Sequence, residues 1–350
     1  MQADFRMFQK INFQSILVYG ISGVLLWLTF YSSGIHLKDI RLEGNQWYYF
    51  TAAIISFIIA TWVQSERARL LWTDDIKKRR KVYTYASILI GNFYNSVLPG
   101  NLGDGVRAWH FSKKLSTRFS ASLAAVFTEK WIDAQVFVLT NLVFFLFKLP
   151  ANRYIFQAIG YISSMVLVLV TIYLLMARYR AFEKAIWLFV FNFKRPGRFL
   201  FKIYRHVTWQ LLCLRNNGLI LYYVFLCIVI LFFNVMQFFL LFKAADINGP
   251  VLTFSTAYIC AIGMMVIAII PAAPGNIGVL HYGIYSILVL TAQRYGIEPG
   301  PVQLHAFALT GIYLHISYII PDVTMGALAL IKEKKLIAGI NTSAIQTLGN

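Results

Sequence analysis

Two groups of ionisable residues lie inside apolar stretches of the sequence, where a charge is costly. Asp104 and Arg107 form the first group, and Glu129, Lys130 and Asp133 form the second. Ionisable side chains at membrane depth usually mark the path of a substrate or an ion. A guanidinium offers forked donors that suit a phosphate. We therefore expect these residues to bind a charged ligand; the alternative is that they only pair with one another.

Helical spacing determines which of these side chains share a face. Asp104 and Arg107 are three residues apart, so they can pair within one helix. Glu129 and Asp133 share a face at a spacing of four, and Lys130 reaches Asp133 at a spacing of three. If the second group lay at the end of a helix rather than in the middle, its side chains would be solvated and would carry little functional meaning.

The first group directly follows a helix-breaking phrase that occurs twice in the chain. Residues 99–103 read PGNLG, and residues 274–278 read PGNIG. Proline removes a backbone donor and glycine loosens a helix, and broken backbone in lipid needs cover from protein or a watery cavity. Amides at the start of the next helix also favour an anion. Matched breaks predict a transport site, whereas two ordinary proline kinks are the alternative.

Binding residues are therefore predicted at both breaks and just before the first. They are Asn92, Asn95, Pro99, Gly100, Asn101, Gly103, Pro274, Gly275, Asn276, Gly278 and His281. Asn92 and Asn95 line a polar cavity or satisfy backbone groups freed by Pro99; the sequence leaves both roles open.

Three histidines lie within predicted membrane segments of the second half of the chain, at positions 281, 305 and 315. Either a proton relay or hydrogen-bonded packing fits a membrane histidine. Their spacing does not suggest a metal site. No nucleophile elbow, Walker loop or dinucleotide fingerprint occurs, so we expect neither catalytic residues nor a cofactor.

The composition is that of an all-α polytopic membrane protein. The chain is 59% hydrophobic and 13% charged, with a mean hydropathy of +0.64. Apolar segments leave no room for a soluble catalytic domain. The net charge of +18 comes from Lys and Arg in short loops, which fits the positive-inside rule better than binding of nucleic acid.

Hydropathy and charge together predict about six full spans and two re-entrant helical hairpins. The spans are expected at residues 14–33, 47–64, 119–147, 154–177, 218–243 and 301–331, the hairpins at 82–112 and 253–292, and a cytoplasmic-surface segment at 178–217. Residues 101–112 would form a helical arm of about 18 Å, too short for a hydrocarbon core of about 30 Å.

Lys and Arg set the expected orientation. With both termini cytoplasmic, 24 of the 32 Lys and Arg residues fall in cytoplasmic segments, including seven in the loop 65–81. Residues 1–150 and 151–350 then read as two membrane repeats of inverted topology. The expected location is the cytoplasmic membrane of a bacterium or archaeon.

The residues around both breaks resemble the lysylphosphatidylglycerol synthase transmembrane, or flippase-like, family. Segments 91–109, 127–137 and 271–283 carry the resemblance, which spans nearly the whole chain. The family's first motif matches Pro99, Gly100, Gly103, Asp104 and Arg107, and its acidic-basic-x-x-Asp motif matches Glu129, Lys130 and Asp133, with Lys where Arg is usual. Its second motif often has Gly at the position of Asn276 and Glu at that of His281.

This resemblance implies movement of a lipid between leaflets, in some members an aminoacylated phospholipid. The chain stops soon after Lys335, so the cytosolic aminoacyl-transferase domain of those members is not expected. The predicted function is a lipid translocase for a phosphate-bearing or an aminoacylated or glycosylated lipid. The alternatives are an intramembrane transferase with Asp104 or Glu129 as base, or a non-transporting assembly partner of a cell-envelope enzyme. Expected partners are anionic membrane lipids, with self-association or an envelope enzyme also compatible.

Overall fold

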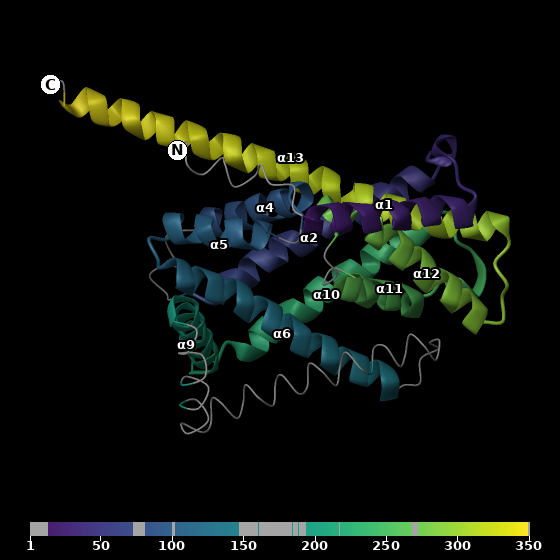
Figure 1. Ribbon diagram of the computed structural model, residues 1–350, viewed down its shortest axis with the longest axis horizontal. Coiled ribbons are helices and arrows are strands. Elements are labelled where there is room, and N and C mark those ends of the chain that lie inside the picture. Colours follow the sequence, from purple (N-terminus) through teal and green to yellow (C-terminus); the bar gives the residue numbers. More distant parts are fainter. Residues whose placement is uncertain are drawn as a thin grey trace. The chain divides into compact units, whose positions relative to one another are not determined.

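The computed structural model describes residues 13–72, 81–99, 102–146, 194–216, 218–267 and 272–348, with the single residues 160, 184 and 188. All regular structure in this part of the chain is helical, which confirms the all-α class (Figure 1). The helices are α1 (Phe13–Ser33), α2 (Gln46–Arg69), α4 (Lys81–Val97), α5 (Gly103–Lys114), α6 (Phe119–Leu146), α9 (Lys194–Asn216), α10 (Ile220–Ala244), α11 (Phe254–Ile267), α12 (Val279–Arg294) and α13 (Pro301–Leu348), with short 3-10 turns η2 (Leu37–Asp39), η3 (Gly249–Val251) and η4 (Pro274–Asn276).

Four described helical segments are long and apolar enough to cross a membrane. They are Gln46–Arg69, Ile220–Ala244, Pro274–Arg294 and Pro301–Glu333. Three of them coincide with predicted spans, whereas Pro274–Arg294 covers the second half of the hairpin predicted at 253–292. Shorter apolar helices lie at Val18–Ser33 and Phe254–Ile267. The predicted span 154–177 lies outside the described residues, apart from Gly160.

The span predicted at 119–147 corresponds to α6, which is not among the four segments that are long and apolar enough to cross. It has 28 residues, and any stretch of 18 within it contains Glu129, Lys130 and Asp133. At 1.5 Å per residue its length of about 42 Å exceeds the membrane core. The helix is therefore long enough to cross while it carries three ionisable side chains.

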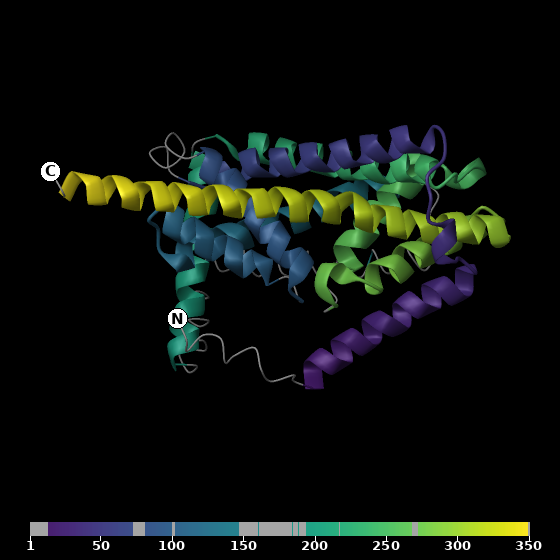
Figure 2. The same ribbon diagram turned by 90° about the horizontal axis from the view of Figure 1, so that it is seen from above.

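Two helix ends differ from the sequence prediction. The helix α2 continues to Arg69, past the predicted end at Gln64, and α13 continues to Leu348, past the predicted end at residue 331. Figure 2 shows α13 as one continuous ribbon, and it stays helical through Pro321. Charged residues end an apolar pattern without breaking a helix, so hydropathy placed both ends too early.

The chain forms two compact units, each assembled from separate segments. Unit 1 comprises residues 1–55, 95–102 and 235–320, and unit 2 comprises residues 56–94, 103–234 and 321–350. Each unit takes segments from both predicted repeats. The inverted repeat at 1–150 and 151–350 stays a prediction.

Within unit 2, α4 and α5 form an antiparallel helical hairpin. Gly91 of α4 lies against α5, because a Cβ at Gly91 would be 2.8 Å from the Arg107 Cβ. Closer to the open end, Ser87 Oγ lies 2.6 Å from His110 Nδ1. This geometry matches the helix–break–helix pattern predicted at 82–112, and its re-entrant placement in a membrane stays a prediction.

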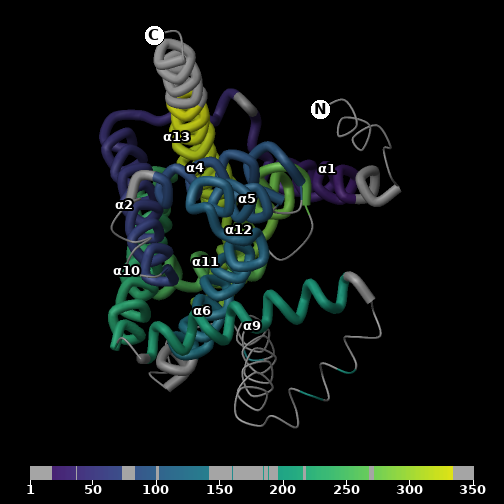
Figure 3. The backbone as a smooth tube through the Cα atoms, turned by 90° about the vertical axis from the view of Figure 1, so that its left-hand side faces the viewer, coloured from purple at the N-terminus to yellow at the C-terminus, as the bar shows by residue number. Residues whose placement is uncertain are grey.

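The helix α6 packs against both α5 and α9 in unit 2, and Figure 3 shows α9 crossing α6. Ile203, Gln210 and Leu214 are buried on one face of α9. Gln210 Oε1 accepts a hydrogen bond of 2.8 Å from the Thr128 hydroxyl of α6. The helix α9 is therefore amphipathic and is anchored by a buried polar contact, while the cytoplasmic-surface placement of segment 178–217 stays a prediction.

Unit 1 is built around α12, which packs against α1 and α11. Small residues bring α11 and α12 together in antiparallel fashion: Gly263 lies against Ile287, and Gly283 lies against Ile267. Gly278, which precedes α12, lies against the backbone of Ser22 in α1. These close approaches fix the position of the second break.

Candidate functional site

A buried arginine of α2 lies at the centre of the charged residues in unit 2. Ala60, Val63 and Arg67 are all buried on one face of α2, and the guanidinium side chain is only 2% exposed. Sequence analysis placed Arg67 in a loop, whereas it lies in the last turns of α2. The signal was present, because Arg67 continues the seven-residue spacing of the buried Ala53 and Ala60.

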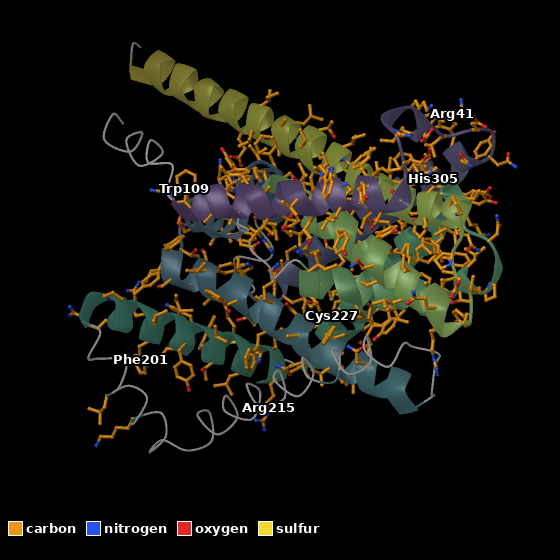
Figure 4. All side chains as sticks on the ribbon, turned by 45° about the vertical axis from the view of Figure 1, so that its right-hand side comes forward. Arg41, Trp109, Phe201, Arg215, Cys227 and His305 are labelled. Carbon is orange, nitrogen blue, oxygen red and sulfur yellow. The ribbon has the colours of Figure 1, made fainter. Side chains whose placement is uncertain are left out.

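Arg67 contacts α6 and α10 simultaneously. It makes two hydrogen bonds to the Asp133 carboxylate, of which Nη2 to Oδ2 measures 3.0 Å. Its Nη1 donates to Cys227 Sγ at 3.2 Å, and its guanidinium lies 5.6 Å from the centre of the Tyr223 ring. Cys227 is labelled in Figure 4 on α10. A two-pronged ion pair of this kind fixes the orientation of both side chains.

Glu129 bridges two buried arginines. Its Oε1 accepts a hydrogen bond of 2.6 Å from Arg107 Nη2, and its Oε2 lies 3.6 Å from Arg67 Nη2. Arg67, Arg107 and Glu129 are each 2% exposed. Buried charges persist only when they are paired, so Glu129 holds α2, α5 and α6 in one ionic network. It does not lie at a solvated helix start.

The remaining ionisable groups form the accessible edge of this network. Lys130 Nζ lies 3.5 Å from Asp104 Oδ2, and their side chains are 61% and 27% exposed. The Asp133 side chain is 32% exposed. All five residues that the sequence singled out thus lie together. The pairs that helical spacing allows within one helix are not the ones observed: Arg107 pairs with Glu129 rather than Asp104, and Lys130 pairs with Asp104 rather than Asp133, because α5 packs against α6.

We call the set Arg67, Asp104, Arg107, Glu129, Lys130 and Asp133 the ionic cluster. It contains three cations and three anions, so its net charge is zero. A buried core and a partly exposed edge are thus combined in one group of side chains.

The two asparagines before the first break differ in their contacts. Asn92 Nδ2 donates to Asp322 Oδ1 of α13 at 3.1 Å, and Asp322 is a buried carboxylate that sequence analysis missed. The Asn95 Oδ1 is buried without a hydrogen-bond partner among the described residues. Asn92 therefore hydrogen-bonds to the Asp322 side chain rather than to the backbone groups that Pro99 frees.

The first break itself is only partly described. Pro99 follows α4, and Gly103 is the buried first residue of α5. Gly100 and Asn101 lie outside the described residues.

The second break contains three residues with positive φ. Gly275, Asn276 and Gly278 have φ of 64°, 57° and 82°. Asparagine tolerates this region better than other residues with a side chain, so Asn276 can stand where the resemblance implies Gly. A Cβ at Gly275 would lie 3.6 Å from the Ser96 carbonyl oxygen. Within unit 1, the second break therefore lies beside the residues that lead into the first.

His281 caps the helix that follows the second break. Its Nδ1 accepts a hydrogen bond of 3.3 Å from the Gly278 N–H, the contact that a glutamate makes at the third helical position of a capping box. Its ring centre lies 4.9 Å from that of His315. The Tyr318 hydroxyl donates to the Gly275 carbonyl at 2.5 Å and lies 3.1 Å from His315 Nδ1. Pro274 is the first residue of η4, the short 3-10 turn that precedes Gly278.

His305 lies apart from that pair. With Arg41, which is also labelled in Figure 4, it lines a pocket of about 200 Å³ in unit 1. The three histidines are therefore not equally scattered, since two of them are in contact. Among the described residues, no three His, Cys, Asp or Glu side chains gather closely enough to hold a metal ion.

Comparison with known proteins identifies the family. The model of the lysylphosphatidylglycerol synthase TM region matches residues 15–321. Neither a curated protein nor a solved structure matches the sequence. The matched region contains the whole ionic cluster and both breaks. The chain therefore belongs to the lysylphosphatidylglycerol synthase TM-region family.

Proposed function

We propose that this protein moves a phospholipid with a phosphate-bearing headgroup, in particular an aminoacylated one, between the leaflets of a membrane. The family gives the chain a lipid-related role in the membrane. The observation that carries the finer proposal is the ionic cluster, in which a buried Arg67–Glu129–Arg107 core adjoins three partly exposed charges.

The charge balance of the cluster suits a headgroup that carries both signs. A phosphate would bind Lys130, and the ammonium of an aminoacyl ester would bind Asp104 and Asp133. The charged atoms of the Lys130–Asp104 pair are separated by 3.5 Å and both side chains are partly exposed, and solvent-accessible pairs contribute little to stability. It can therefore open for the headgroup while the buried core keeps the helices in place.

The test is lipid translocation in vesicles reconstituted with the full chain. Lys130→Gln is expected to slow movement of a fluorescent lysylphosphatidylglycerol about tenfold, which corresponds to about 1.4 kcal/mol of lost headgroup binding. Dithionite, which cannot cross the membrane, bleaches the outer leaflet and so reports arrival of lipid from the inner one. Asp104→Asn should slow the lysyl lipid more than phosphatidylglycerol, because it removes a partner of the ammonium.

Lys113→Gln is the matched control, since Lys113 is an exposed lysine of α5 without a partner among the described residues. Its rate should equal that of the wild type. Equal rates for Lys130→Gln and Lys113→Gln would contradict the proposed role of the ionic cluster.

A further inference from the structure

A groove lies on unit 2, away from the contacts that hold the ionic cluster together. It is formed by α4, α5 and the part of α13 after Pro321, and its volume is about 310 Å³. That value falls at the lower end of the ~300–1,000 Å³ typical of sites for small ligands. None of the six cluster residues lines it.

A glycine of α13 brings this helix into close contact with α4 beside the groove. A Cβ at Gly326 would lie 2.5 Å from the Phe93 Cβ and 2.8 Å from the Leu89 carbonyl oxygen, so α13 and α4 touch there. One turn further along, the small side chains of Ala86 and Ala329 line the groove instead of filling it. The helices α13 and α4 are thus in contact at Gly326, and the small side chains one turn away leave the groove open between them.

The lining of the groove changes from apolar to cationic. Ala86, Leu89, Leu328 and Ala329 form the apolar part, and the Leu328 side chain is 65% exposed. Lys114, Lys332 and Glu333 line it as well, together with Tyr83. Tyrosine and lysine beside an apolar surface are typical of the membrane–water boundary.

The charged residues of the lining carry a net positive charge. Glu333 is already engaged, since its Oε1 lies 2.7 Å from His110 Nε2 and its Oε2 lies 3.4 Å from Lys114 Nζ. Lys332 is exposed and has no partner among the described residues. An anion can therefore bind Lys332 without displacing an existing ion pair.

We propose that this groove binds a phospholipid with an anionic headgroup, with one acyl chain against the leucines and alanines and the phosphate against Lys332 and Lys114. The site is separate from the ionic cluster and does not depend on the proposed translocation. It joins α13 to the α4–α5 hairpin through a lipid that stays bound.

The test is photo-labelling of the purified full chain by a phosphatidylglycerol with a diazirine on one acyl chain. Phosphatidylcholine with the same chain is the comparison, and mass spectrometry of peptides locates the label. Labelling of residues 325–332 is expected to be about fivefold stronger with phosphatidylglycerol, which corresponds to ~1 kcal/mol for one basic residue near a lipid surface.

Two variants of the groove and two controls make the assignment specific. Ala329→Phe, which fills the groove, should remove most labelling by both lipids. Lys332→Gln, a change of an exposed side chain, should abolish the preference for phosphatidylglycerol, while Lys113→Gln and Lys130→Gln should change nothing. Equal labelling by both lipids in the wild type, or labelling that survives Ala329→Phe, would overturn the proposal. Because Lys130→Gln affects translocation only, failure of one proposal can be told from failure of the other.

Discussion

Replacing Glu129 with Ala is expected to lower the free energy of unfolding by about 3–5 kcal/mol, the cost of leaving a buried charge unpaired. Glu129 is 2% exposed and bridges Arg67 and Arg107. Without it, Arg67 keeps Asp133 as a partner, but Arg107 retains no ion pair among the described residues. Denaturation of the purified protein in detergent, followed by circular dichroism, measures the loss.

A double variant separates the charge effect from the loss of packing. Arg107→Met combined with Glu129→Leu removes both partners of the buried Arg107–Glu129 pair, so no unpaired charge remains there, and we expect it to recover more than half of the stability that Glu129→Ala loses. Asp104→Asn, at the accessible edge of the cluster, should cost less than about 1 kcal/mol. A double variant less stable than Glu129→Ala would contradict the account of Glu129 as a bridge between buried cations.

The second large effect is expected from Gly278→Ala. Gly278 has a φ of 82°, and a Cβ there would overlap the carbonyl group of Ser22 in α1. Left-handed strain alone costs about 1–3 kcal/mol, and the overlap also forces α1 away from α12. We expect a total loss of at least about 3 kcal/mol, measured by the same denaturation.

Gly23→Ala is the matched control, because Gly23 follows Ser22 in α1 and a Cβ there meets nothing within 4 Å. Replacing a glycine inside a helix with alanine stabilises the helix by roughly 0.5–1 kcal/mol. Gly23→Ala should therefore be at least as stable as the wild type. Similar losses for both variants would show that α1 tolerates no added methyl group, and would refute the specific role of Gly278.

Sequence reasoning found the charged side chains but not their partners. Asp104, Arg107, Glu129, Lys130 and Asp133 stand out because charge is rare in apolar segments. Helical spacing allows pairs within single helices, whereas the observed contacts run between α5 and α6. Helical spacing describes one helix at a time and carries no information on which helices pack together.

Arg67 and Asp322 were missed for different reasons. Arg67 lies between Glu66 and Arg69 at the end of α2. Hydropathy averaged over these charged neighbours is low, so the segment resembles a loop and the buried face of the helix is not visible. Asp322 is a single acidic residue in the predicted span 301–331, and its partner Asn92 is distant in sequence. The contact between His281 and His315 was likewise unpredictable, since it depends on how α12 and α13 pack.

Translocation by the wild-type protein tests most directly the proposed movement of intact lipid across a bilayer. Vesicles containing the purified chain and a fluorescent lysylphosphatidylglycerol would be treated with dithionite, and the recovered lipid analysed by mass spectrometry. We predict that the inner-leaflet fluorescence becomes accessible in the vesicles that contain protein and that an unlabelled lysyl lipid carried alongside keeps its mass. Inner-leaflet fluorescence as well protected as in protein-free vesicles, or a changed mass of the unlabelled lipid, would contradict it.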